Sequence, residues 1–333
     1  MQRQDGCRWE VQLNPEEKQV KRFHTALIAA AALALGTAAS AQQTWYPSKF
    51  GPNDELGSAN YLTPALALEA SKLVKTGKTY SLGITVNTTT PAFPPRTCSI
   101  YIVQPGQQGA SEGLGPTKTT YNDDILNCWT GIGTQLDGLG HIGVGDRYYN
   151  GNKWQDFANI SGLKKLSADK IPPFVARGVL LDMAAYYGVE VVKEGTAFNR
   201  AEIEAVAKKQ GVEIRQGDVV IFHTGWLSLI EKDPKRFGSV EPGLGRDGAR
   251  YLVSKNVVAI GADTWGLETI PFEQGAGVFE VHQILLPMGG TYILENINTA
   301  ELAKDKAWEF MFVLGQNKYQ GAVQSMINPV AIR

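Results

Sequence analysis

Residues 128–141 bring chemically capable side chains together among small, flexible residues. Gln135 and Asp137 are two residues apart, so on an extended backbone both side chains point to the same face. His141 follows across the sequence Gly-Leu-Gly, a turn that can bend its imidazole back toward them. An amide, a carboxylate and an imidazole placed in this way are typical of a metal site or an acid/base site.

A second group of ionisable residues lies in the C-terminal half. His282 stands inside the apolar segment 281–286, and Glu295 closes an apolar run that resembles a strand. A buried ionisable group is costly without a partner, and a divalent cation shared with Asp137 would satisfy both residues. The alternative is that His282 is a hydrogen-bonded core residue and that Glu295 pairs with an arginine.

The order of these motifs resembles the cyclase family that includes bacterial kynurenine formamidase and isatin hydrolase. Members carry the pattern His-x-Gly-Thr-His-x-Asp-x-Pro-x-His, which residues 131–141 follow in the same frame. This chain has Gly131 and Gln135 where the family has two histidines, and Leu139 where it has proline. The resemblance extends over about residues 45–333, and further similar segments are 50–57, 60–62, 217–226, 261–264, 282–295 and 325–331.

The resemblance implies a divalent metal held by Asp137, His282 and Glu295, with the carbonyl oxygen of Gln135 as a weak fourth ligand. It also implies that His141 is the catalytic acid/base. Manganese or zinc is the expected ion, and a ligand set rich in oxygen favours manganese, magnesium or calcium over zinc. A weakly held metal and complete loss of the metal both stay open.

Alternating apolar segments predict an α/β fold with a mixed sheet. The expected strands are 79–88, 98–103, 177–183, 218–223, 257–261, 291–294 and 310–314. The expected helices are 64–73, a capped helix that starts at Asn199 and stops at Gly211, 244–255 and 279–286. We find no linker, which predicts one domain over residues 42–333. The resemblance implies the swivelling β/β/α arrangement of the family and a homo-oligomer.

Composition excludes several classes of partner. The chain has 333 residues, of which 43% are hydrophobic and 20% are charged, and its net charge is −1. Such values are typical of a globular enzyme with a small-molecule substrate. Without a basic run, neither nucleic acid nor an anionic membrane surface is an expected partner.

The N-terminus predicts export. Lys21 and Arg22 precede an apolar stretch, and small residues end it at positions 39–41. These are the parts of a signal peptide, and the apolar run is too short for a comfortable membrane span. We therefore assign residues 1–41 to an N-terminal extension and signal peptide, and expect a periplasmic or secreted protein.

Export leaves Cys98 and Cys128 in the mature chain. An oxidising compartment permits a disulfide between them, but two unpaired, buried thiols are the favoured interpretation. Trp129 is expected either to line an aromatic substrate pocket or to lie in the core.

Together these features predict a metal-assisted hydrolase of a C–N amide or cyclic amide bond. The resemblance implies an arylformamidase-like activity, with the conversion of N-formylkynurenine to kynurenine in tryptophan catabolism as the example. A lactone hydrolase is the alternative enzyme. An exported, metal-free small-molecule binding protein is the alternative of a different class, favoured by Gly131 and Gln135.

Overall fold

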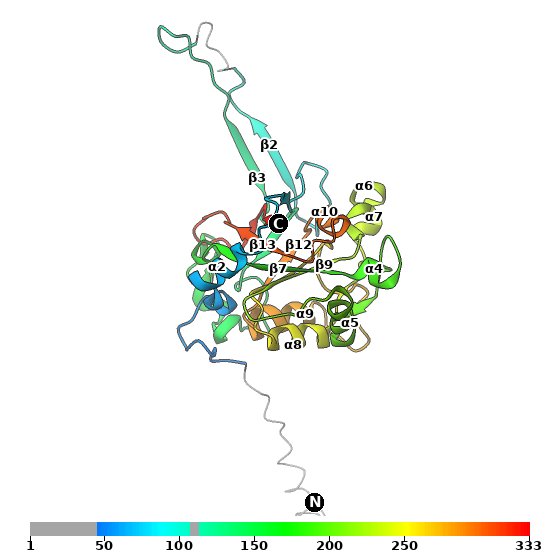
Figure 1. The fold of residues 1–333 in the computed structure, drawn as a ribbon. Helices are drawn as coiled ribbons and strands as arrows, with labels where there is room; N and C mark the ends of the chain where they lie inside the picture. Colours follow the sequence, from blue (N-terminus) through cyan, green and yellow to red (C-terminus); the bar gives the residue numbers. More distant parts are fainter. Residues whose placement is uncertain (1–44, 107–112) are drawn as a thin grey trace, which may run out of the picture. The chain divides into compact units, whose positions relative to one another are not determined.

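A nine-stranded sheet runs through the centre of the protein (Figure 1). The computed structural model describes residues 45–106 and 113–333. In order across the sheet the strands are β1 (Thr79–Ser81), β15 (Val330–Ile332), β13 (Glu309–Leu314), β7 (Phe174–Asp182), β9 (Val219–His223), β11 (Ala259–Ala262), β12 (Tyr292–Glu295), β4 (Gln135–Asp137) and β14 (Gln324–Met326). The four strands from β7 to β12 are parallel, and antiparallel strands flank them on both sides. The predicted α/β class with a mixed sheet is therefore confirmed.

The parallel strands are almost completely buried. Their sequences are continuous apolar runs with little polar alternation, as expected for strands covered on both faces. The helices α5 (Arg200–Gln210), α8 (Arg246–Ser254) and α9 (Glu280–Gln283) lie below the sheet in Figure 1, and α6 (Leu229–Lys232), α7 (Pro234–Phe237) and α10 (Ala300–Lys304) lie above it.

The predicted capped helix is α5. The side chain of Asn199 accepts from the backbone of Glu202, and the Glu202 carboxylate accepts from the Asn199 backbone N–H. Gly211 ends the helix in the left-handed conformation with φ of 72°. The other α-helices of the described residues are α2 (Pro64–Ser71), α3 (Trp154–Phe157) and α4 (Met183–Tyr187), and a π-helical turn, Ile284–Met288, continues α9. The short paired strands are β5 (Ala158–Asn159), β6 (Gly162–Leu163), β8 (Ala197–Phe198) and β10 (Gly243–Leu244).

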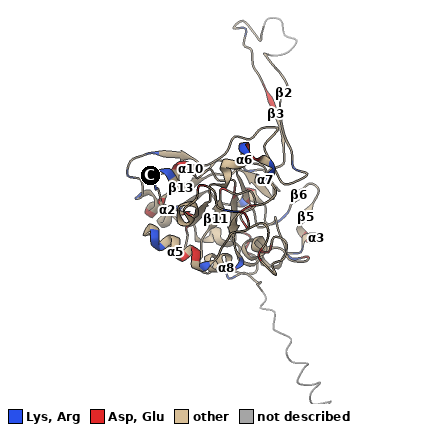
Figure 2. Ribbon diagram, turned by 90° about the vertical axis from the view of Figure 1, so that its right-hand side faces the viewer, with Lys and Arg blue, Asp and Glu red and all other residues tan. Residues whose placement is uncertain are grey.

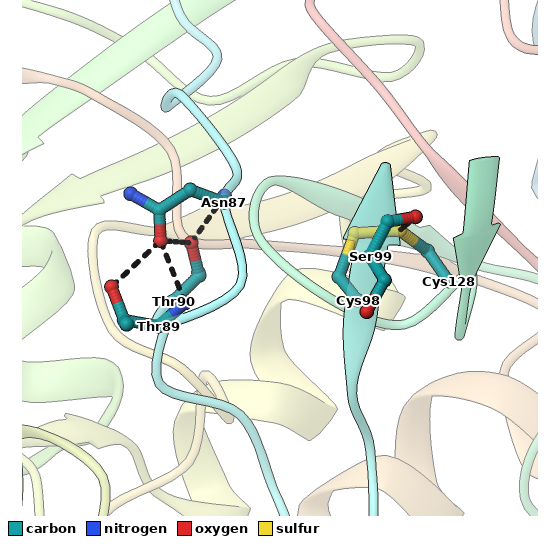
Figure 3. Close-up of a disulfide and its surroundings, with 6 residues drawn as sticks. All are labelled: Asn87, Thr89, Thr90, Cys98, Ser99 and Cys128. Carbon is teal, nitrogen blue, oxygen red and sulfur yellow. Dashed lines mark hydrogen bonds between the residues drawn. A yellow bond between two sulfur atoms is a disulfide. The ribbon is translucent and has the colours of Figure 1, made fainter. Parts of the chain in front are cut away.

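A two-stranded hairpin projects from the body, and we call it the arm (Figures 1 and 2). It consists of β2 (Cys98–Ile102) and β3 (Asp124–Cys128) with the described residues that continue them. Cys98 and Cys128 face each other at its base and form a disulfide, with their Cα atoms 4.0 Å apart (Figure 3). The expectation of two unpaired thiols was wrong, because antiparallel pairing places these residues directly opposite each other.

The predicted strand 79–88 is much shorter than expected. β1 ends at Ser81. The N–H of Leu82 still donates to the carbonyl oxygen of Pro329, and the following N–H groups donate to other partners. The N–H of Gly83 donates to the Asn328 side chain, and that of Ile84 donates to the hydroxyl of Thr134. The neighbouring Pro329 has no N–H to continue the ladder, so the chain leaves the sheet and crosses toward β4.

The proposed extension and signal peptide, residues 1–41, lie outside the described residues. Over 45–106 and 113–333, none of the helices has the length and apolar character that crossing a bilayer requires.

Candidate functional site

β4 and β12 bring Gln135, Asp137 and Glu295 together. In the register of these antiparallel strands Gln135 lies opposite Glu295, and on the other side of β4 Asp137 lies opposite Gln324. Cross-strand partners on one face have side chains in contact. The Gln135 amide donates to Glu295 over 2.5 Å and to Asp137 over 3.3 Å, and the Gln324 amide donates to Asp137 over 2.7 Å. The predicted shared face of Gln135 and Asp137 therefore exists.

His282 reaches the same point from α9. Its Nδ1 hydrogen-bonds the Glu268 carboxylate over 2.6 Å, which leaves Nε2 facing Glu295 at 3.3 Å. Glu268 also accepts the backbone N–H of His282. A carboxylate on one imidazole nitrogen fixes the ring orientation and makes the other nitrogen a better ligand.

Three of the predicted ligands form a compact set. One ligand atom from each of Asp137, His282 and Glu295 lies within 4.8 Å of the others, and all three residues are buried. Oδ2 of Asp137 is buried and accepts no hydrogen bond from the described residues. His141 Nε2 and His282 Nε2 lie 3.8 and 3.9 Å from it. An unpartnered buried carboxylate oxygen is costly, so this point fits a divalent cation.

Gln135 presents its amide nitrogen to both carboxylates. In this orientation it holds the two acidic ligands together. A half-turn of the amide would present the carbonyl oxygen that ligation needs.

Electrostatics also favour a cation. Four carboxylates are buried around this point, namely Asp137, Glu241, Glu268 and Glu295. Burial and the neighbouring Asp137 raise the pKa of Glu295 to about 7. Burial, and then the charge of Glu295, hold the pKa of Glu241 well above its ordinary value. A cluster so rich in carboxylates takes up protons or a divalent cation.

The two site histidines differ in their electrostatics. Burial alone would lower the pKa of His282, but its hydrogen bonds to Glu268 and Glu295 raise it to about 10. Burial lowers the pKa of His141 below its ordinary value, against the attraction of Asp137. His141 follows the expected turn, since its N–H donates to Gly138 O over 3.0 Å.

A cavity of about 210 Å³ opens beside these groups. Its aromatic walls are formed by Phe93, Trp265 and Phe279. Its polar edge is formed by His141, His282, Glu295 and Arg96. The predicted pocket role of Trp129 was wrong, and so was its core alternative, because this side chain is 52% exposed and does not line the cavity.

Gly131 stands where the family pattern has a histidine, and Arg96 and Gln324 lie where its side chain would begin. A Cβ there would lie 2.8 Å from Nη1 of Arg96, 2.8 Å from Oε1 of Gln324 and 2.9 Å from its Nε2. Arg96 donates to the carbonyl oxygen of Gly131 over 2.8 Å. Two polar side chains from distant segments therefore fill the space beside Gly131.

Sequence reasoning missed Glu268, Glu241, Arg96 and Gln324. None of them stands in a motif with a recognisable spacing. Glu268 had one available signal, since an acidic residue near a buried histidine is a common partner for a metal-binding imidazole.

Comparisons with known proteins identify the family of the chain. The family model described as “Cyclase: Putative cyclase” matches residues 80–269, more than half of the chain. A solved structure described as a novel cyclase is 30% identical, with a TM-score of 0.78, and the match covers 86% of this chain and 98% of that one. The chain belongs to the cyclase family. Its predicted fold class, the mixed-sheet β/β/α arrangement of this family, is confirmed.

More distant structures share the fold. Isatin hydrolase A from Ralstonia solanacearum is 18% identical, with a TM-score of 0.59 and coverage of 82% of this chain and 98% of that chain. A predicted metal-dependent hydrolase from Bacillus stearothermophilus is 17% identical, with a TM-score of 0.51 and coverage of 77% and 98%. Among the curated proteins compared, none matches this chain in sequence.

Proposed function

We propose that this protein is a metal-assisted hydrolase of C–N amide or cyclic amide bonds, with arylformamidase-like activity. The observation that carries the proposal is the buried, unpartnered Oδ2 of Asp137, which two histidine nitrogens approach within 4 Å. The cyclase fold and its similarity to isatin hydrolases and a metal-dependent hydrolase support a hydrolase.

Asp137, His282 and Glu295 would hold the cation, with Gln135 beside them. When bound, a divalent metal acidifies water and polarises a carbonyl group. Glu268 orients His282 through the hydrogen bond on Nδ1.

His141 is the proton carrier in this proposal. Burial keeps its pKa low, so the imidazole is neutral near pH 7 and can accept a proton. Asp137, 3.8 Å away, then attracts the imidazolium that forms. In hydrolysis of an aryl formamide, the water oxygen bonds to the formyl carbon and the C–N bond breaks. His141 takes a proton from water and returns it to the leaving nitrogen, so that an arylamine and formic acid result, and the acid releases its proton to solvent to give formate.

Metal analysis with a substrate panel tests the proposal. Protein purified without chelators should contain close to one metal ion per chain and hydrolyse N-formylkynurenine or isatin in a chelator-sensitive reaction. Hydrolysis confined to lactones would favour the lactone hydrolase. Absence of both bound metal and hydrolysis after addition of manganese and zinc would favour the metal-free binding protein.

We also propose that the protein is exported to the periplasm or secreted, on the evidence of the signal-peptide pattern in residues 1–41. N-terminal sequencing of protein from the periplasm or medium should give a start near Gln42. A cytoplasmic product that keeps residues 1–41 would contradict this.

The arm supports the further proposal of a homo-oligomer. Five of its apolar side chains are 51–55% exposed, namely Ile100, Tyr101, Ile102, Ile125 and Leu126. Cross-strand pairing puts Ile100 with Leu126 and Tyr101 with Ile125, so adjacent pairs make both faces of the hairpin apolar. Figure 2 shows few charged residues along it. An isolated two-stranded hairpin is marginal in water, and a second copy would cover both arms at once.

Light scattering of the purified protein tests this. The wild type should have a multiple of the monomer mass, and Ile100→Ser with Leu126→Ser should reduce it. Leu68→Ser is the matched control, since Leu68 is an exposed leucine on α2. A monomeric wild type would contradict the proposal.

A further inference from the structure

The guanidinium of Arg96 lies at the edge of the cavity with most of its donors unused. Nη1 donates to the carbonyl oxygen of Gly131. Arg96 forms no ion pair with a carboxylate anywhere in residues 45–106 and 113–333. A guanidinium has five N–H donors, so most of them remain for another acceptor.

This placement depends on Gly131. A Cβ on that residue would lie 2.8 Å from Nη1 of Arg96, so the side chain of Arg96 can take this position only beside glycine. Arg96 is also close enough to Glu295 to lower the pKa of that carboxyl, although burial and Asp137 dominate in the other direction. The guanidinium is thus near the proposed reacting centre.

The rest of the cavity fits a flat ring. Phe93 stacks with Trp265, with ring centroids 5.9 Å apart and an interplanar angle of 25°, and Phe279 meets Phe93 edge to face. Cavities of about 150 Å³ hold benzene. The volume of about 210 Å³ therefore suits a single aromatic ring with small substituents.

We propose that Arg96 binds a carboxylate on the substrate, so that the substrates are single-ring aromatic amides that carry an acidic group. The inference rests on the proposed hydrolase function and narrows its substrate class. A planar guanidinium recognises a carboxylate through two parallel hydrogen bonds, which lysine or glutamine cannot reproduce. Anchored at Arg96 and packed against the aromatic walls, the ring presents its amide to the side of the cavity formed by His141, His282 and Glu295.

Binding experiments test Arg96 without any need for turnover. Benzoate and benzamide have nearly the same shape and differ in charge. In calorimetry with the full-length protein, benzoate should bind more tightly than benzamide. Arg96→Gln should weaken benzoate by about 10–100-fold, the effect of losing a charged hydrogen-bonded pair, and change benzamide less than about threefold. Arg215→Gln is the matched control, because this arginine is exposed and pairs with Glu213.

Kinetics give a second readout. With N-formylanthranilate and its uncharged analogue formanilide, Arg96→Gln should raise KM for the anthranilate only, and kcat should change little. If neither compound is hydrolysed while the benzoate result holds, the proposed function fails and the carboxylate site stands. If both are hydrolysed and Arg96→Gln affects them equally, the function stands and the carboxylate site fails.

Two further outcomes would overturn the inference. Benzoate binding that is lost on treatment with a chelator and is insensitive to Arg96→Gln would place the carboxylate on the metal.

Arg96→Lys is a second variant for the case in which Arg96→Gln prevents folding, because lysine keeps the positive charge and lacks the planar guanidinium. The Arg96→Lys protein should bind benzoate more weakly than the wild type does and keep part of the preference for benzoate over benzamide. Affinities for benzoate and benzamide that are both unchanged would refute the role of Arg96.

Discussion

Restoring the family histidine at position 131 should destabilise this protein, because its space is occupied. In Gly131→His, the new Cβ would lie 2.8 Å from both Arg96 and Gln324. Both flexible side chains would have to move, with loss of the bond from Arg96 to the Gly131 carbonyl and the bond from Gln324 to Asp137. Hydrogen bonds to charged groups contribute about 1.5–3 kcal/mol each, but only the flexible ends of these two side chains have to move, so the net loss in the free energy of unfolding should be about 1–3 kcal/mol.

Urea unfolding followed by tryptophan fluorescence would measure this loss. Gly315→His is the matched control, since nothing lies within 4 Å of a Cβ at that glycine, and it should cost less than about 0.5 kcal/mol. Gly131→His combined with Arg96→Ala and Gln324→Ala should be less destabilised than the sum of the separate changes, because the histidine then has room. A Gly131→His protein as stable as the wild type would show that Arg96 and Gln324 do not fill this space.

Three other predictions concern the chemistry of the site. His141→Ala should lower kcat by about 10²–10⁴-fold with unchanged metal content, and a joint loss of metal would make His141 a ligand instead. Gln135→His should shift the metal preference toward zinc, as metal analysis after competition between zinc and manganese would measure. Asp137→Ala should abolish metal binding and activity together. Activity in metal-free Asp137→Ala protein would exclude the metal-assisted mechanism. With a pKa raised to about 10, His282 is protonated at pH 8 in metal-free protein and must lose that proton to become a ligand. Metal binding at pH 8 should therefore release about one proton from His282, and the affinity for the metal should rise with pH up to about pH 10. Calorimetry in buffers of different ionisation enthalpy measures the number of protons released. A number of released protons that does not change with pH would contradict this prediction.

The sequence alone determined the features that depend on local spacing. The two-residue separation of Gln135 and Asp137 placed both on one face of a strand, and the glycine-rich turn returned His141 toward them. The buried parallel strands were predictable from their continuous apolar runs, and α5 from its capping residues, because backbone periodicity and caps act within a few residues.

Only the tertiary structure decided which distant residues complete the site. Register between β4 and β12 set Gln135 against Glu295, and register is fixed by packing of the whole sheet. Glu268 reaches His282, and Arg96 occupies the space beside Gly131, through contacts between segments far apart in the chain. The disulfide also depends on tertiary structure. Cys98 and Cys128 are 30 residues apart in the chain, and the antiparallel pairing of β2 with β3 brings them together. Such contacts form when strands and loops close over long distances, and no short-range pattern in a single sequence records them.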